Sequence, residues 1–193
     1  MKLIVNEIFY SLQGEGGRSG EASIFIRLTK CNLACSFCDT DFANGEEMTV
    51  DEILQVISAY PCKWIIWTGG EPTIQLKDEH LAIFREHGYK QAIETNGTRR
   101  VPSLIDYITC SPKQDYDSIK TRIPFADEIR MPIEVGDAIP DISVFPDANN
   151  YFLSPVFDGD VINLANVSYC VELIQKHPQW RLSLQIHKLI HIE

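Results

Sequence analysis

Three cysteines crowded into eight residues constrain this chain more than any other feature. Cys31, Cys35 and Cys38 follow one another with the spacing C-x3-C-x2-C. Disulfides use cysteines in pairs, and a structural zinc site normally takes four ligands, usually as two separated pairs. Three thiolates on one short loop instead suit an iron–sulfur cube in which one iron has no protein ligand. That open iron can bind a small molecule, so the spacing predicts a reactive centre.

A zinc site is the alternative, because a fourth ligand could come from elsewhere in the chain. Cys62, Cys110, Cys170 or one of the five histidines could supply it. We expect these three cysteines to be core residues, since a buried free cysteine behaves as a small apolar side chain.

The composition is that of one globular domain. The chain has 193 residues, of which 45% are hydrophobic, so we expect a single domain over residues 1–193. No stretch approaches the roughly 18 apolar residues of a membrane span, and the N-terminus has no signal-peptide pattern. We therefore expect a cytoplasmic protein with reduced thiols. A net charge of −10 without a Lys/Arg cluster argues against a nucleic-acid partner.

The cysteine spacing, with Phe37 directly before the third cysteine, resembles the signature of the radical S-adenosylmethionine (radical SAM) enzymes. In that family the open iron binds the amino and carboxylate groups of SAM, and an electron from the cluster cleaves SAM to a 5′-deoxyadenosyl radical. The longer string CNLACSFCDT, residues 31–40, is similar to that of the 7-carboxy-7-deazaguanine synthases of queuosine and deazapurine biosynthesis. The resemblance implies a [4Fe-4S] cluster on the three cysteines and SAM as its ligand.

Four further strings resemble the same synthases and fall in the expected order. They are LQGEG at residues 12–16, TGGEP at 68–72, ETNG at 94–97 and SPK at 111–113. Each alone would be an ordinary turn or loop. The resemblance implies that the last three, with residues near the cysteines and after a late strand, bind SAM. The implied SAM contacts are Phe37, Asp39, Gly69, Gly70, Glu71, Glu94, Asn96, Ser111, Pro112, Lys113 and Ser154.

The resemblance also implies a pterin site and a magnesium ion. Arg27, between Ile26 and Leu28, could be a surface residue whose head reaches solvent, or a clamp for the substrate carboxylate, which the resemblance favours. Thr40 matches a threonine that ligates Mg²⁺ in the synthases; by itself it would be a turn residue. The implied substrate contacts are Leu12, Gln13, Gly14, Glu15, Arg27, Thr68 and Glu193.

Hydrophobic periodicity predicts strands and helices in alternation. The expected strands cover residues 2–10, 22–28, 63–67, 90–94, 107–110, 128–135, 151–153 and 181–186. The expected helices cover 49–59, opened by a capping box, 76–86, and 161–177, capped by Asp160. Residues 136–150 are expected to form a loop.

Polar strings follow the ends of these strands, and parallel strands joined by helices bring those ends to one rim. A full eight-unit barrel takes at least about 200 residues. We therefore predict an α/β fold, an incomplete (βα)6-type radical SAM barrel with few helices and an N-terminal extension. A doubly wound, flavodoxin-like sheet is the alternative. One departure from many relatives, Ser154–Asp158 in place of Gln-Pro followed closely by Asp, is expected to remove or move a SAM contact.

The activity implied by the resemblance is that of a carbon–nitrogen lyase. It is the Mg²⁺-dependent contraction of 6-carboxy-5,6,7,8-tetrahydropterin to 7-carboxy-7-deazaguanine, with release of ammonia. The implied partners are flavodoxin or a similar reductant and a second copy in a homodimer, with no nucleic acid and no membrane. The alternatives are an activase that makes a glycyl radical on a partner protein, which would not be expected to carry LQGEG or Thr40, and a zinc-stabilised binding module without catalysis.

Overall fold

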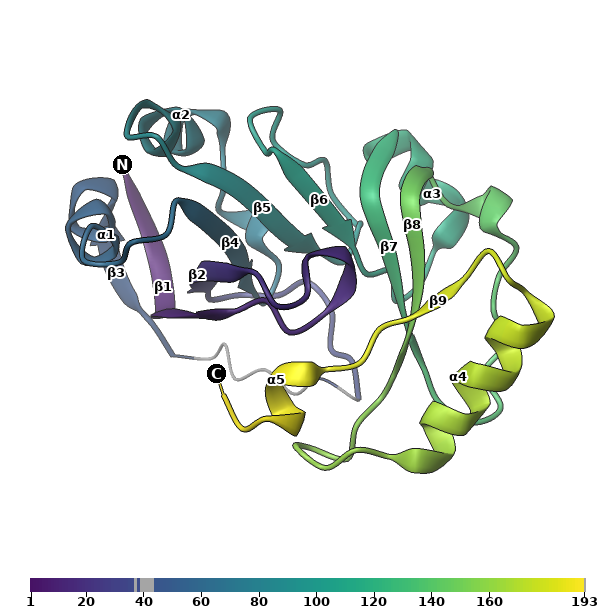
Figure 1. Cartoon of the computed structure of the whole chain (residues 1–193). Coiled ribbons are helices and arrows are strands. Elements are labelled where there is room, and N and C mark those ends of the chain that lie inside the picture. The colour runs from purple at the N-terminus through teal and green to yellow at the C-terminus, as the bar shows by residue number, and fades with distance from the viewer. Residues whose placement is uncertain (37, 39–43, 193) are drawn as a thin grey trace.

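Figure 1 shows the computed structural model of the chain, which describes residues 1–36, 38 and 44–192. The predicted roles of Phe37, Asp39, Thr40 and Glu193 fall outside these residues and stay predictions. The strands are β1 (Lys2–Leu12), β2 (Ala22–Leu28), β3 (Glu46–Thr49), β4 (Trp64–Gly69), β5 (Lys90–Thr95), β6 (Tyr107–Cys110), β7 (Phe125–Ile133), β8 (Asp147–Pro155) and β9 (Arg181–Leu182). The helices are α1 (Val50–Ile57), α2 (Asp78–Glu86), α3 (Tyr116–Arg122), α4 (Leu164–Lys176) and α5 (Ile186–Leu189), with 3-10 turns η1 (Gly16–Arg18), η2 (Pro72–Ile74) and η3 (Ile142–Val144).

In the part of the chain that the structure describes, seven parallel strands form the curved wall of an incomplete barrel. Within the described residues one sheet runs in the order β3-β1-β2-β4-β5-β6-β7-β8-β9. From β2 to β9 each strand is parallel to the next one along this order. A doubly wound sheet would reverse its strand order at a switch point, so the flavodoxin-like alternative is wrong. The sheet ends at β3 and β9 without closing, which confirms the predicted open barrel.

The N-terminal extension is a hairpin whose tip folds into the concave side of the sheet. β1 runs antiparallel to β2 and to β3. The turn after β1 ends in η1, where the amide of Gly17 donates to the Glu128 carboxylate on β7 at 2.7 Å. β1 and β7 are far apart in the strand order, so the hairpin tip crosses the interior of the barrel to reach β7.

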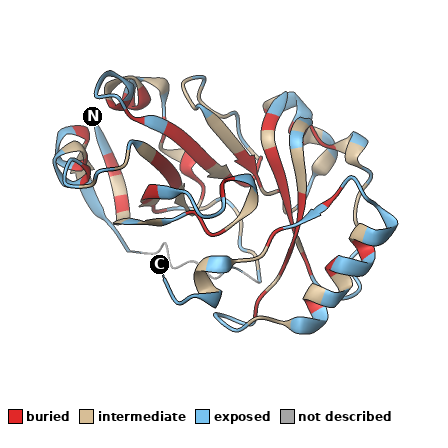
Figure 2. Cartoon of the chain, viewed as in Figure 1, coloured by how far each residue is buried: buried red, intermediate tan, exposed pale blue. Residues whose placement is uncertain are grey.

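Alternation along the strands separates a buried face from a polar one. Ile24, Ile26 and Leu28 of β2 are fully buried, as predicted, and Phe25 and Arg27 between them face the concave side. Figure 2 shows the resulting red bands along the central strands. Helices α1, α2 and α4 pack against β1, β5 and β8 respectively, so the apolar face is covered by helices.

Two apolar clusters fill the space between the sheet and its helices. In the first, the rings of Trp67 on β4 and Phe84 on α2 meet edge to face, with centroids 5.1 Å apart. The second contains Cys110 and Cys170, which are completely buried, as predicted. Cys62 was predicted to be core but is only half-buried, at the border of the first cluster.

The predicted capping box opens α1. The Thr49 hydroxyl accepts from the amide of Glu52 at 3.2 Å, and the Glu52 carboxylate accepts from the amide of Thr49 at 2.7 Å. These two bonds satisfy donors that a helix start otherwise leaves without partners.

The second half of the chain differs most from the predicted elements. Helix α4 begins at Leu164 rather than 161, because Asn163 and not Asp160 caps it, accepting from the amides of Ala165 and Asn166. The predicted loop 136–150 is wrong in its last part, since β8 already begins at Asp147. β3 and α3 were not predicted.

The last predicted strand is shorter than expected. β9 ends at Leu182 and α5 follows, because the chain turns back to the hairpin tip, where the amide of Ile186 donates to the carbonyl of Gly14 at 2.9 Å. Among the described residues, no helix has the length and apolar character required to cross a lipid bilayer.

Candidate active site

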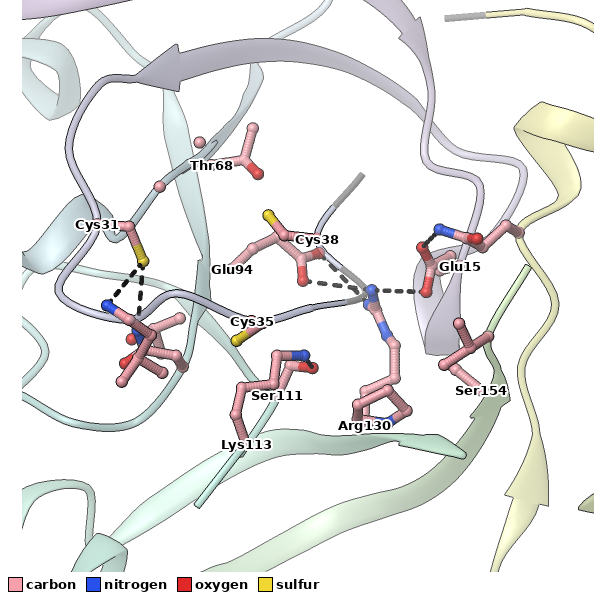
Figure 3. A pocket seen from close by; sticks show the side chains of 18 of the residues that line it. Glu15, Cys31, Cys35, Cys38, Thr68, Glu94, Ser111, Lys113, Arg130 and Ser154 are labelled. Atoms are coloured by element: carbon pink, nitrogen blue, oxygen red, sulfur yellow. Dashed lines mark hydrogen bonds and ion pairs between the residues drawn. The ribbon is translucent and has the colours of Figure 1, made fainter. Parts of the chain in front are cut away.

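A cavity of about 240 Å³ opens at the carboxyl ends of the parallel strands. Figure 3 shows its side chains, most of which come from the cysteine loop after β2 and from the ends of β4, β5, β6, β7 and β8. Glu15, after β1, and Gln185, after β9, complete the lining. The predicted site residues that line it are Glu15, Cys31, Cys35, Cys38, Thr68, Gly69, Gly70, Glu94, Asn96, Ser111, Lys113 and Ser154. Residues more than a hundred positions apart in sequence thus meet in one place.

Cys31, Cys35 and Cys38 all line this cavity, from the loop that follows β2. The sulfur of Cys31 accepts from the amide of Leu33 at 3.4 Å and lies 4.0 Å from the side-chain amide of Asn96. The amide of Cys38 donates to the carbonyl of Cys35 at 3.2 Å, which closes a turn between them. Donors aimed at sulfur stabilise a thiolate and tune an iron–sulfur cluster.

The electrostatics of Cys35 reflect the crowding of the thiols. Burial raises the pKa of Cys35, the charge of Lys113 lowers it, and the nearby thiols of the other two cysteines raise it further. Among the described residues no three Cys, His, Asp or Glu side chains converge on a point where they could hold one metal ion. A four-iron cube does not require such convergence, because each cysteine binds a different iron.

The glycine pair after β4 lets that strand end lie against the cysteine loop. The amide of Gly70 donates to the carbonyl of Leu28 at 3.1 Å, and the amide of Glu71 donates to that of Lys30 at 2.8 Å. A Cβ atom at Gly69 or Gly70 would lie 2.0 Å from one of these two carbonyl oxygens. Only glycine fits at either position, and the turn holds the start of the cysteine loop in place.

Glu71 does not line the cavity but connects the segments that form its wall. Its buried carboxylate accepts from the Thr73 hydroxyl at 2.6 Å, the Thr95 hydroxyl at 2.8 Å and the amide of Asn96 at 2.7 Å. Its hydrogen-bonding capacity is therefore used by the chain itself, at the ends of β4 and β5. Pro112 likewise is buried and is not among the residues that line the cavity.

Polar groups at the ends of β6 and β8 also line the cavity. The Lys113 ammonium donates to the Ser111 hydroxyl at 2.7 Å, and burial lowers the pKa of Lys113. The Ser154 hydroxyl is buried and has no hydrogen-bond partner among the residues that the structure describes. Because an unpaired buried hydroxyl is unfavourable, this atom fits a cavity made for a polar ligand such as SAM.

A second, larger cavity of about 870 Å³ lies beside the first. It is lined by the predicted substrate residues Leu12, Gln13, Gly14, Glu15, Arg27 and Thr68. The two cavities share Glu15, Thr68, Glu94, Arg130 and Gln185. The groups that the sequence assigned to a cofactor and to a substrate are thus in adjoining cavities with a common wall.

The LQGEG loop is held to the rest of the site by its side chains and by its glycines. The Gln13 amide donates to the Glu94 carboxylate at 3.0 Å, and the Gln185 amide donates to the Glu15 carboxylate at 3.1 Å. A Cβ atom at Gly14 would lie 2.0 Å from the ring of His187. This glycine therefore permits close contact between the loop and the C-terminal segment.

Arg27 lies in the wall of the larger cavity, and its guanidinium pairs with Glu7 on the neighbouring strand at 2.5 Å. It is mostly buried but keeps access to the cavity. The interpretation of Arg27 as a clamp for a carboxylate stays a prediction, and Glu7 would compete for it.

The sequence analysis missed the charged group at the centre of the shared wall. Arg130 is buried and lies 3.2 Å from Glu15, 3.3 Å from Glu94 and 2.5 Å from Glu128. Burial alone would lower the pKa of Arg130, but the three carboxylates raise it above its usual value. The signal was present in the alternation of β7, which places Glu128 and Arg130 on one face between buried apolar residues.

Glu94 has the most perturbed carboxylate of the site. The pKa of Glu94 is raised to about 7. Burial is the largest cause and the like charges of Glu128 and Glu15 add to it, whereas Arg130 and the hydrogen bond from Gln13 oppose the shift. At neutral pH this side chain is therefore poised to hold or to release a proton.

Comparison with known proteins agrees with this geometry. The radical SAM superfamily pattern matches residues 25–119. The chain is 45% identical over 188 residues to a 7-carboxy-7-deazaguanine synthase of Bacteroides thetaiotaomicron, with 97% of each chain covered, and 45% identical over 197 residues to one of Haemophilus influenzae, covering 97% and 92%. The crystal structure of QueE from Escherichia coli superposes with a TM-score of 0.74 and 26% identity over 97% of this chain and 95% of that one.

The fold and the cysteine cavity define a radical SAM enzyme, which carries a [4Fe-4S] cluster and uses SAM. Within that class, the chain belongs to the 7-carboxy-7-deazaguanine synthase family. The glycyl-radical activase and the zinc-stabilised module are therefore wrong as descriptions of this protein.

Proposed function

We propose that this chain is a carbon–nitrogen lyase that converts 6-carboxy-5,6,7,8-tetrahydropterin to 7-carboxy-7-deazaguanine with release of ammonia. The observation that carries the proposal is the pair of adjoining cavities, one bearing the three cysteines and the other bearing the LQGEG loop. A reaction between a cofactor and a bound substrate requires such a shared boundary, because the reacting atoms must be held close together.

The smaller cavity is the place we propose for the cofactors. Cys31, Cys35 and Cys38 would hold the cluster, and SAM would lie against Asn96, Ser111, Lys113, Ser154 and the glycine pair. When bound, the cluster and SAM together would supply the abstraction of a hydrogen atom from carbon. The SAM ammonium would bind carbonyl oxygens of the turn, since the amides of Gly70 and Glu71 already donate within the chain. Glu71 and Pro112 would support this wall from outside the cavity. Phe37 and Asp39 would contact SAM directly.

The larger cavity is the place we propose for the pterin. Arg27 would bind the substrate carboxylate, as guanidinium groups do in a bidentate manner. The carboxylate of Glu15 and the amide of Gln13 would meet the amino and carbonyl groups of the pyrimidine edge. Thr68 would close the boundary between the two ligands, with Leu12 and Gly14 beside the ring. We also assign Glu193 a contact with the pterin.

Proton transfer is the second task of the shared wall. Loss of ammonia requires that the departing nitrogen gain protons. With a pKa of about 7, Glu94 can carry a proton at neutral pH and release it without a large free-energy penalty. We propose that Glu94 serves this step from the boundary between the two cavities.

Three further assignments complete the proposal. Mg²⁺ would bind Thr40 and the substrate, because hard oxygen ligands suit this ion and it often takes only one or two of them from protein. Electrons would come from flavodoxin or a similar small reductant. The chain would act as a homodimer.

The proposal is tested by turnover under anaerobic conditions. Protein reconstituted with iron and sulfide is incubated with SAM, dithionite and 6-carboxy-5,6,7,8-tetrahydropterin, and the product is detected by mass. We expect 7-carboxy-7-deazaguanine and one ammonia for each pterin consumed. Protein that holds about four irons and cleaves SAM but leaves the pterin unchanged would refute it.

A further inference from the structure

Glu128 is a buried charge that lines neither cavity. It lies on the concave face of β7, beneath the shared wall. Its carboxylate accepts from the amide of Gly17 at 2.7 Å and from the hydroxyls of Tyr107 and Thr109, each at 3.2 Å. It also pairs with the Arg130 guanidinium at 2.5 Å. A buried carboxylate is tolerated only with such partners, and these four partners come from three parts of the molecule: the turn η1, β6 and β7 itself.

The first consequence of this position concerns the hairpin tip. Gly16 adopts a left-handed φ of 68°, and a Cβ atom there would lie 2.2 Å from a Glu128 carboxylate oxygen. The turn that carries Glu15 therefore rests directly on Glu128. If this support moved, the LQGEG loop would move relative to the strands that carry the rest of the site.

The second consequence concerns Arg130. One guanidinium faces three carboxylates, and its Nε has no partner among the described residues. Glu128 is the most buried of the three carboxylates, with 1% of its side chain exposed against 16% for Glu15 and 21% for Glu94. Because solvent screens a buried ion pair least, the contact with Glu128 is the one best suited to fix the guanidinium.

We propose that Glu128 is a positioning residue that acts through Arg130 and the Gly16–Gly17 turn to hold the Glu15 and Glu94 carboxylates at the boundary of the two cavities. Glu128 is not among the residues that line either cavity, so its role would be to position other side chains. The proposal rests on the proposed function for the identity of the substrate, but not for the geometry that it describes.

Glu128→Gln tests the proposal because it keeps the shape of the side chain and removes its charge. Asp127→Asn is the matched control: Asp127 is the neighbouring carboxylate on β7, points to the opposite face and accepts from the amide of Ile108 at 2.8 Å. We expect Glu128→Gln to weaken pterin binding about tenfold, as for loss of a charged hydrogen bond. SAM affinity and iron content should stay within about twofold, and Asp127→Asn should bind pterin like the parent.

A double-mutant cycle with Glu15→Gln separates positioning from general loosening of the fold. If both variants act through Arg130, their effects on pterin affinity will be less than additive. Additive effects, or unchanged pterin affinity in Glu128→Gln, would overturn the proposal.

A crystal structure of Glu128→Gln gives a readout that does not depend on the substrate. We expect the Arg130 guanidinium to leave its position between Glu15 and Glu94, and the turn at Gly16 to shift. If the parent fails to bind the pterin, the proposed function fails while this structure still decides the positioning role. An unmoved Arg130 and an unmoved turn would contradict it.

Discussion

The two faces of β7 carry opposite chemistry. Ile129, Met131 and Ile133 face the helices and are buried in the second apolar cluster, whereas Glu128 and Arg130 face the interior of the open barrel. The first face stabilises the folded state because it removes apolar area from water. The second is held by charged hydrogen bonds and supports the loops of the site. Changes on the apolar face should therefore lower stability, and changes on the concave face should alter binding and chemistry.

The largest effect is expected at the rim above the concave face. Cys35→Ala should abolish product formation and prevent assembly of a complete cluster, because one iron would lose its only protein ligand. Iron analysis and visible absorption after anaerobic reconstitution measure this. Cys62→Ala, which alters a half-buried cysteine far from the cavity lining, should keep full iron content. Four irons in Cys35→Ala would show that the ligand is wrongly assigned.

On the apolar face, Ile129→Ala should lower the free energy of unfolding by about 2 to 5 kcal/mol, because it leaves a cavity in a packed cluster. Urea unfolding of the apoprotein measures the change. Its neighbour variant Glu128→Gln should shift pterin affinity instead, with SAM affinity kept. If Ile129→Ala impaired binding in a protein that stays folded, the division between the two faces would be wrong.

The concave face should also make stability depend on pH through Glu94. The pKa of Glu94 is raised from 4.5 to about 7. Between these two pH values the folded protein holds a proton on Glu94 that the unfolded chain has lost. Stability from this site is present below pH 4.5 and is lost as pH rises through 7. The loss is at most about 3 kcal/mol, and partial access of water reduces it.

Glu94→Gln should remove this dependence. Urea midpoints of the parent and the variant, measured at pH 5 and pH 8, give the comparison. We expect the parent to weaken relative to the variant over this range. Parallel behaviour of the two proteins would show that Glu94 is ionised throughout.

The smallest effect is expected at the start of α1, away from both faces. Thr49→Ala removes the capping box and should lower stability by about 1 kcal/mol without changing pterin or SAM affinity. Ser58→Ala, at the other end of the same helix, is the control. A binding defect in Thr49→Ala would connect α1 to the site in a way that the contacts do not suggest.

The difference between the two faces also explains how far the sequence could predict the structure. Alternation in β2 placed Ile24, Ile26 and Leu28 correctly, and the polar strings after the strands located the rim. β6 matches its predicted range in full. These features depend on local periodicity and on turn chemistry, which neighbouring residues determine.

What the sequence could not predict depends on contacts between distant segments. Glu128 and Arg130 look like exposed charges on a strand until the hairpin tip is known to lie on them. Glu71 belongs to a motif typical of cofactor binding, yet its carboxylate accepts hydrogen bonds from Thr73, Thr95 and Asn96. The cap at Asn163 was missed because Asp160 is an equally good capping residue by type.

The central claim is that the two adjoining cavities form one active site, with SAM on the cysteine side and the pterin beside the LQGEG loop. The most direct measurement is an anaerobic crystal structure of the reconstituted protein with both ligands bound. We predict the pterin within hydrogen-bond distance of Glu15 and Gln13, with its carboxylate on Arg27, and SAM between the cysteines and Ser154. A pterin bound outside the larger cavity, or SAM lying against the LQGEG loop, would contradict the account.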